Sequence, residues 1–335
     1  MDSERRPCRV FVAGATGTIG RATVRALLAR GHAVTALVRA RPDGGPRPAG
    51  LEGADVRAGD VTDAASIERD GFRGERFDAV VSCLASRTGE PADARAIDHR
   101  AHSALLAAAQ CAGATRFVLL SAICVQKPLL AFQQAKLAFE RELRDAPLDW
   151  SIVRPTAFFK SLSGQIERVR RGRPFLVFGD GTLTACKPIS DDDLGAFLAD
   201  CVDDPARWRR VLPIGGPGPA ITPREQGEML FGLLGTEPRF RRVPVGLLDA
   251  IVAVLSVGGR IVPALARKAE LARIGRYYAT ESMLVLDPDT GRYDAAATPE
   301  TGTQTLRDHY ARMLRGEVEA GLGEHAVFDA GRRAG

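Results

Sequence analysis

This sequence is poor in lysine and tyrosine, and no two of its cysteines stand at the spacing of a metal or redox site. Only five of its 46 basic residues are lysine, and four residues are tyrosine. The net charge of +5 is spread along the chain, which argues against a nucleic-acid surface and suits a small anionic ligand. The six cysteines form no CxxC motif, so we expect reduced, buried thiols and no metal site.

The sequence also lacks an apolar run long enough to cross a bilayer. Its most apolar stretch, 243–274, is interrupted by Asp249, Arg260, glycines and a proline. We favour a pair of helices packed on a sheet, with a lid over a large flat ligand or a membrane-contacting surface as alternatives. The first strand begins so early that we expect no signal peptide and a cytoplasmic protein, with membrane association as the alternative. The oligomeric state is not predicted.

Short apolar stretches alternate with helical patterns through the first half of the chain. The strands are expected at 9–13, 33–39, 54–61, 77–85, 115–123 and 148–159, with helices at 19–31, 66–72, 96–113 and 128–146. This alternation predicts an α/β protein with a doubly wound parallel sheet. We expect a nucleotide-binding domain over 1–155. A smaller substrate-binding lobe over 156–335 would include returns to the sheet such as 191–204 and 210–216.

The sequence GATGTIG places Gly14, Gly17 and Gly20 between the first strand and the first helix. Small residues there let the backbone approach a pyrophosphate, and the helix start supplies N–H donors. The motif therefore predicts a dinucleotide site. The other residues that we expect to contact the cofactor in this turn are Thr16, Thr18 and Ile19.

The second strand ends in ALVR, so that Arg39 stands at its tip and Arg41 two residues later. An acidic residue there would favour NAD, whereas a guanidinium matches the 2′-phosphate of NADP. We therefore predict NADPH as the cofactor. Asp60 and Val61, after the third strand, are expected to border the adenine.

The fourth and fifth strands lead to the expected nicotinamide end of the site. Cys83, Leu84 and Ala85 follow the fourth strand and Ser121 follows the fifth, and ligands of this fold gather at such carboxyl ends. No histidine is placed to activate Cys83, so a packing role is favoured over a nucleophile.

Phe132 and Lys136 stand one helical turn apart and face the same way. A tyrosine and a lysine hold this spacing in many nucleotide-dependent reductases, and phenylalanine cannot transfer a proton. With GATGTIG, ALVR, GDVTD and CLAS, the chain resembles the atypical short-chain dehydrogenase/reductases. The blocks LSAICVQKPLLAFQQAKLAFE, RPTAFFKSLSGQ, ACKPISDDDLGAFLADCV and RYYATESMLVLDPDTGRYD resemble the NADPH-dependent divinyl chlorophyllide 8-vinyl reductases.

That resemblance implies reduction of the 8-vinyl group of a Mg-porphyrin, divinyl chlorophyllide or protochlorophyllide, to ethyl in (bacterio)chlorophyll biosynthesis. It gives Lys136 the role of hydrogen-bonding the nicotinamide ribose, and Phe132 an apolar face for the flat ring. Tyr277 and Tyr278 are candidate proton donors, and Ser121 and Lys127 are weaker ones. The alternatives are an isoflavone-reductase-like or quinone reductase, and an NADP-sensing regulator or assembly factor without catalysis.

Overall fold

The computed structural model describes residues 7–39, 48–259 and 262–318. Internal contacts divide the chain into two compact units. The first comprises Met1–Ser86, Pro91–Pro155 and Asp191–Pro213, and the second comprises Arg87–Glu90, Thr156–Ser190 and Ile214–Gly335. The chain therefore leaves the first unit briefly after Ser86 and again after Pro155, and then returns to it for one helix and most of one strand.

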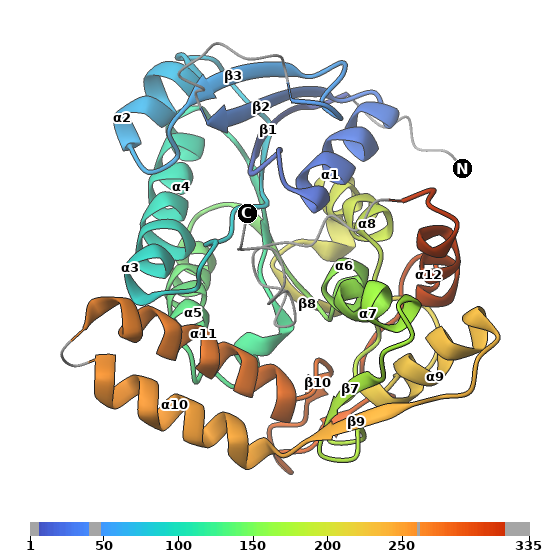
Figure 1. Cartoon of the computed structure of the whole chain (residues 1–335). Coiled ribbons are helices and arrows are strands. Elements are labelled where there is room, and N and C mark those ends of the chain that lie inside the picture. Colours follow the sequence, from blue (N-terminus) through green and yellow to red (C-terminus); the bar gives the residue numbers. More distant parts are fainter. Residues whose placement is uncertain (1–6, 40–47, 260–261, 319–335) are drawn as a thin grey trace. The chain divides into compact units, whose positions relative to one another are not determined.

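The first unit is built on a seven-stranded sheet in the order β3-β2-β1-β4-β5-β6-β8 (Figure 1). The strands are β1 (Arg9–Ala13), β2 (Ala33–Arg39), β3 (Asp55–Gly59), β4 (Ala79–Ser82), β5 (Arg116–Leu120), β6 (Asp149–Pro155) and β8 (Arg210–Ile214). Each neighbouring pair from β3 to β6 is parallel. The order reverses direction beside β1, which makes the sheet doubly wound as the sequence predicted.

Helices cover both faces of this sheet. They are α1 (Thr18–Ala29), α2 (Ala64–Ser66), α3 (Pro91–Ala94), α4 (His102–Cys111), α5 (Ala131–Asp145) and α8 (Asp191–Asp203). Helices α1 and α8 pack together on one face, and α4 and α5 lie on the other (Figure 1). Two π-helical segments, η1 (Ile67–Phe72) and η2 (Arg95–Ala101), continue α2 and α3. Short 3-10 turns cover Ile123–Gln126 and Pro205–Arg207.

Aromatic rings fill the core between the sheet and the α4–α5 face. Phe11 of β1 stacks on Phe72 with ring centres 4.1 Å apart, and Phe77 meets both rings edge-on. Phe117 of β5 lies 5.9 Å from Phe139 of α5. All five rings are buried, and each such burial stabilises the fold by roughly 1.5–3 kcal/mol.

The second unit has its own core and two small sheets. Strands β7 (Phe175–Phe178) and β9 (Phe240–Val243) pair in parallel, and β10 (Val285–Leu286) pairs with β11 (Tyr293–Asp294) in antiparallel fashion. The helices are α6 (Phe159–Leu162), α7 (Ile166–Arg170), α9 (Pro223–Leu234), α10 (Val245–Gly259), α11 (Pro263–Thr280) and α12 (Leu306–Leu314), with a 3-10 turn at Ser163–Gln165. Tyr310 is fully buried in this core and donates a hydrogen bond to the carbonyl of Leu162.

The apolar stretch at 243–274 forms the expected pair of helices, α10 and α11, which pack against each other. No residue of α10 is buried, however. None of the helices in the described part of the chain is both long and apolar enough to span a bilayer.

Candidate cofactor and reduction site

The turn between β1 and α1 is closed by contacts that only glycine permits. Gly14 has a φ of +78°, and a Cβ on it would lie 2.6 Å from the carbonyl carbon of Cys83. A Cβ on Gly20 would lie 2.2 Å from the carbonyl oxygen of Gly14. The end of β1, the segment after β4 and the first turn of α1 are therefore in direct backbone contact.

This packing leaves the start of α1 open to a ligand. Gly17 is the N-cap residue of α1, and it has no side chain that could bond the N–H groups of the first turn. Thr16, Gly17 and Thr18 are exposed, while Ile19 is half-buried. Uncapped N–H donors at the positive end of a helix form an anion site, and the turn fits a cofactor pyrophosphate.

The tips of β2 and β3 bring a positive charge beside a negative one. Arg39 is exposed and stands opposite Gly59 in the parallel register. The next residue, Asp60, accepts hydrogen bonds from the backbone N–H and the hydroxyl of Thr62. These bonds lower the pKa of Asp60, and the charge of Arg39 lowers it further. Val61 is half-buried beside Asp60, and Arg41 lies outside the described residues.

The residues after β4 line this edge without offering a nucleophile. Cys83 keeps some exposed surface, but desolvation raises the pKa of its thiol to about 12. Its sulfur lies 3.8 Å from the hydroxyl of Thr23. The protonated thiol is a packing group at neutral pH. Leu84 is buried and Ala85 is exposed.

Ser121, after β5, is bound within the protein. It is buried, and its hydroxyl donates to Glu140 Oε1 at 2.6 Å. Glu140 also forms an ion pair with Arg154. The Ser121 hydroxyl is thus held by a buried carboxylate on α5, a partner that sequence reasoning missed.

Lys136 and Phe132 both lie on α5, as expected, but the lysine has a partner on another element. Its ammonium nitrogen lies 3.0 Å from Oδ1 of Asp98, which belongs to the π-helical segment η2. Both residues are buried, with exposed fractions of 8% for Lys136 and 1% for Asp98. Phe132 is half-buried. Sequence reasoning did not identify Asp98, because its sequence neighbours give no sign of a pairing with α5.

His102, one turn after Asp98, completes this buried polar cluster. Its ring lies 4.8 Å from that of Phe139, and Nδ1 lies 2.8 Å from the carbonyl oxygen of Ile97. Burial, followed by the charge of Lys136, lowers the pKa of His102 to about 4. The imidazole is therefore neutral at neutral pH, and Nδ1 carries the proton that binds Ile97.

The candidate proton donors lie in different units. Tyr277 and Tyr278 are on α11 of the second unit, where their rings meet edge-on with centres 5.7 Å apart. Tyr277 is buried, whereas Tyr278 is 42% exposed. Lys127, in the first unit, is exposed. Their roles as proton donors stay predictions.

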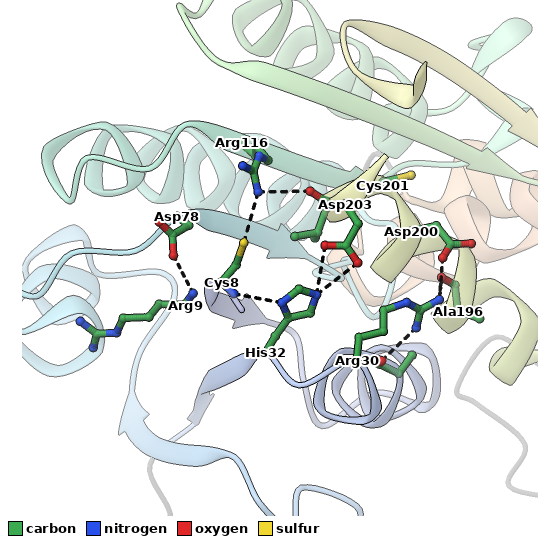
Figure 2. Close-up of polar contacts among 12 residues, drawn as sticks. Cys8, Arg9, Arg30, His32, Asp78, Arg116, Ala196, Asp200, Cys201 and Asp203 are labelled. Atoms are coloured by element: carbon green, nitrogen blue, oxygen red, sulfur yellow. Dashed lines mark hydrogen bonds and ion pairs between the residues drawn. The ribbon is translucent and has the colours of Figure 1, made fainter. Parts of the chain in front are cut away.

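A second cluster looks like a catalytic triad but has the wrong connections (Figure 2). His32 Nδ1 accepts a hydrogen bond from the backbone N–H of Cys8 at 3.1 Å, and Nε2 lies 3.2 Å from Asp203. The Cys8 sulfur instead accepts from Arg116. Because the imidazole bonds the backbone of Cys8 and not its thiol, it cannot activate that thiol, and the cluster ties β1 and β2 to α8.

Comparisons with known proteins agree with a nucleotide site. The model of an NAD(P)H-binding family matches residues 14–205. The divinyl chlorophyllide a 8-vinyl-reductase of Oryza sativa subsp. indica is 52% identical over 331 residues, which cover 95% of this chain and 82% of the relative. The photosystem II assembly factor Ycf39 of Synechocystis is 27% identical over 247 residues, 72% of each chain.

Among solved structures, the NADPH-dependent quinone oxidoreductase of Escherichia coli in complex with NADPH superposes with a TM-score of 0.66. It covers 91% of this chain and 99% of its own, at 17% identity. At that identity the likeness shows the fold alone.

Substitutions in the glycine turn separate cofactor binding from folding. Gly17 has φ and ψ values that alanine tolerates, and a Cβ would lie 3.5 Å from the nearest atom. We expect Gly17→Ala to weaken NADPH binding by ~10-fold or more by crowding the pyrophosphate, while costing less than ~1 kcal/mol of unfolding free energy. Gly20→Ala should cost ~1–3 kcal/mol, because its Cβ overlaps the backbone.

Fluorescence titration with NADPH measures the affinity for the cofactor, and urea denaturation measures the free energy of unfolding. Gly232→Ala is the matched control, because Gly232 lies in α9 with open space around its Cα. Gly232→Ala should lower neither the affinity for NADPH nor the free energy of unfolding. Unchanged NADPH affinity in Gly17→Ala would show that the turn does not hold the pyrophosphate.

Proposed function

This chain belongs to the NAD(P)H-binding family and, within it, to the divinyl chlorophyllide a 8-vinyl-reductases. We propose that it reduces the 8-vinyl group of divinyl chlorophyllide to ethyl, with NADPH as the hydride donor. The similarity at 52% identity over 95% of the chain carries this proposal. The same similarity supports a role in chlorophyll biosynthesis, and we extend the proposal to bacteriochlorophyll biosynthesis. Protochlorophyllide is the second pigment to be tested.

The residues around Lys136 suit this reaction better than carbonyl reduction. When bound, the nicotinamide supplies a hydride, and a vinyl group conjugated to the macrocycle can delocalise the resulting negative charge. No oxygen anion then needs a neighbouring acid, so a phenylalanine at position 132 is acceptable chemically. We assign to Lys136 the orientation of the nicotinamide ribose, and to Phe132 an apolar contact with the flat ring.

A visible-range assay tests the activity. The protein with NADPH should shift the Soret band of divinyl chlorophyllide to the blue, and Phe132→Tyr should fold normally without gaining carbonyl reductase activity. Turnover of a quinone without a shift in the pigment would favour the quinone reductase alternative. Binding of NADPH without oxidation of the cofactor by any acceptor would favour an assembly factor or a regulator.

We propose NADPH over NADH because Arg39 is an exposed guanidinium at the tip of β2, where the adenosine ribose is expected. The carboxylate nearby, Asp60, accepts two hydrogen bonds from Thr62 at Oδ1, and the charge of Arg39 lowers its pKa. Because Arg39 is exposed, its guanidinium can turn to a 2′-phosphate, which matches it in charge and in fork geometry.

Replacement of Arg39 tests this preference. Arg39→Ala should raise the KM for NADPH by ~10–100-fold, the loss of one charge-assisted hydrogen bond, and leave the KM for NADH almost unchanged. Arg171→Ala is the control for overall charge, since Arg171 is an exposed arginine beside α7 that pairs with Glu167. An equal rise for both cofactors in Arg39→Ala would contradict the assignment.

We also propose that α10 contacts the surface of an anionic membrane. Its exposed apolar side chains recur every three or four residues and so share one face; they are Leu247, Ile251, Val254 and Val257, with exposed fractions of 51%, 39%, 72% and 63%. The one charge on α10, Asp249, is paired with Arg276 of α11. Helix α10 is apolar nearly all round, and an exposed apolar surface of this kind marks a contact site for a membrane or another protein.

The charges around α10 favour anionic lipid over an uncharged surface. Arg241 and Arg242, on β9 just before α10, are exposed. Arg267 and Lys268 are exposed on α11, and Arg267 also lies 3.9 Å from a carboxylate oxygen of Glu90. The acidic residue of α11, Glu270, is buried and paired with Arg273. The exposed excess is therefore basic, and each such residue near an anionic surface contributes about 1 kcal/mol.

Vesicle sedimentation tests this surface. The protein should pellet with vesicles of phosphatidylcholine and phosphatidylglycerol and be released by high salt, and Val254→Glu should abolish pelleting by placing a charge in the apolar face. Leu129→Glu, a change at a 60% exposed leucine outside the pair of helices, is the control. If Val254→Glu impairs turnover of a detergent-dispersed pigment but wild-type protein never pellets, α10 is a lid instead.

A further inference from the structure

Lys136 is held by a carboxylate at the place where a reductase of this class would use a phenol. In the reductase pattern, the tyrosine four residues earlier supplies an oxygen beside the lysine. Here that residue is Phe132, which has no polar atom. Lys136 instead lies 3.0 Å from Asp98 Oδ1, from a different element of the fold.

The local fold gives Asp98 this position. It lies in the π-helical turn Arg95–Ala101 between α3 and α4, and this turn packs on α5. The wider π turn is rare in proteins and occurs frequently at functional sites. The same oxygen, Oδ1, accepts a hydrogen bond of 3.2 Å from the backbone N–H of Ser86. Asp98 thus links Lys136 to the segment that follows β4, where Cys83 touches Gly14.

Stability alone does not account for a buried ion pair here. Taking an ammonium and a carboxylate out of water costs several kcal/mol for each ion, and apolar replacements are often as stable. The second oxygen of Asp98 is buried and has no hydrogen-bond partner among the described residues. A purely structural pair would be expected to satisfy both oxygens. The neighbouring His102 is neutral, so it does not compete as a counter-charge.

We propose that Asp98 is the positioning residue of Lys136, orienting its ammonium toward the cofactor ribose in place of the phenolic oxygen that Phe132 lacks. This inference rests on the proposed function, because it assumes that Lys136 serves the bound cofactor. Asp98 acts through Lys136 and touches neither cofactor nor pigment. Its replacement should therefore have no effect of its own on turnover once Lys136 is removed.

A double-mutant cycle tests this dependence. Asp98→Asn keeps the shape and an acceptor for Ser86 but removes the charge, and Lys136→Met removes the ammonium. We expect each single change to lower kcat by ~10–100-fold, with the pigment KM changed less than ~3-fold, and the double variant to be no slower than Lys136→Met. Equal, multiplicative losses from the two changes would overturn the proposal, as would full activity in Asp98→Asn.

Two further variants test whether the loss of activity in Asp98→Asn reflects a general loss of structure. Asp98→Glu keeps the charge and should recover part of the lost activity; no recovery in a folded protein would count against the proposal. Glu300→Gln breaks the ion pair of a different buried lysine, Lys187, and should leave kcat unchanged. A comparable loss in Glu300→Gln would mean that the effect of Asp98→Asn is one of stability.

NADPH binding separates this inference from the pigment assignment. If the wild type reduces no pigment, the proposed function fails, but titration of the four cycle proteins with NADPH still reports on Asp98. We expect Asp98→Asn and Lys136→Met to weaken NADPH binding by similar factors that do not multiply in the double variant. Equal affinity in all four proteins would overturn the positioning role.

Discussion

The missing side chains at Gly14 and Gly20 are the constraint on which the nucleotide site depends. They bring three backbone segments into contact, the end of β1, the start of α1 and the residues after β4. The positive end of α1 can then lie against the carboxyl edge of the sheet with its first N–H groups uncapped. The turn that would hold the pyrophosphate therefore consists of backbone groups. Its cost to folding is entropic, because glycine loses more conformational freedom on folding than any other residue. The surrounding aromatic core and the α1–α8 packing offset that cost.

Helix α5 divides its inner face between polar and apolar groups. Lys136 and Glu140, one turn apart, are both buried and each is paired across the fold, with Asp98 and with Arg154. Phe139 and Leu143 on the same helix enter the apolar core. Buried charges persist only where partners are held in place. These partners come from η2 and β6, so the polar end of α5 is fixed by the tertiary fold rather than by its own sequence.

The sequence predicted the elements of the first unit well, because their signals are local. Alternating burial, the glycines of the first turn and the Phe132–Lys136 spacing each depend on residues within one helix or strand. The partner of Lys136 could not be found in this way, because Asp98 is 38 positions earlier and the π turn that presents it has no distinct sequence pattern. The sequence could not predict the exposure of α10 either. Its apolar composition fits a buried helix as well as a surface one, and only the structure shows that none of its residues is buried.

The replacement of a phenol by a carboxylate beside Lys136 has a chemical consequence. A tyrosine can accept a hydrogen bond from the lysine and also give up its own proton, whereas a carboxylate paired with an ammonium only accepts hydrogen bonds. Asp98 can therefore orient Lys136, as the tyrosine would, but it cannot donate a proton as the tyrosine does. That division suits a reaction whose negative charge spreads over a macrocycle and whose proton goes to carbon. The proton would then come from water or from another acid, and Tyr277 and Tyr278 of α11 stay the predicted donors.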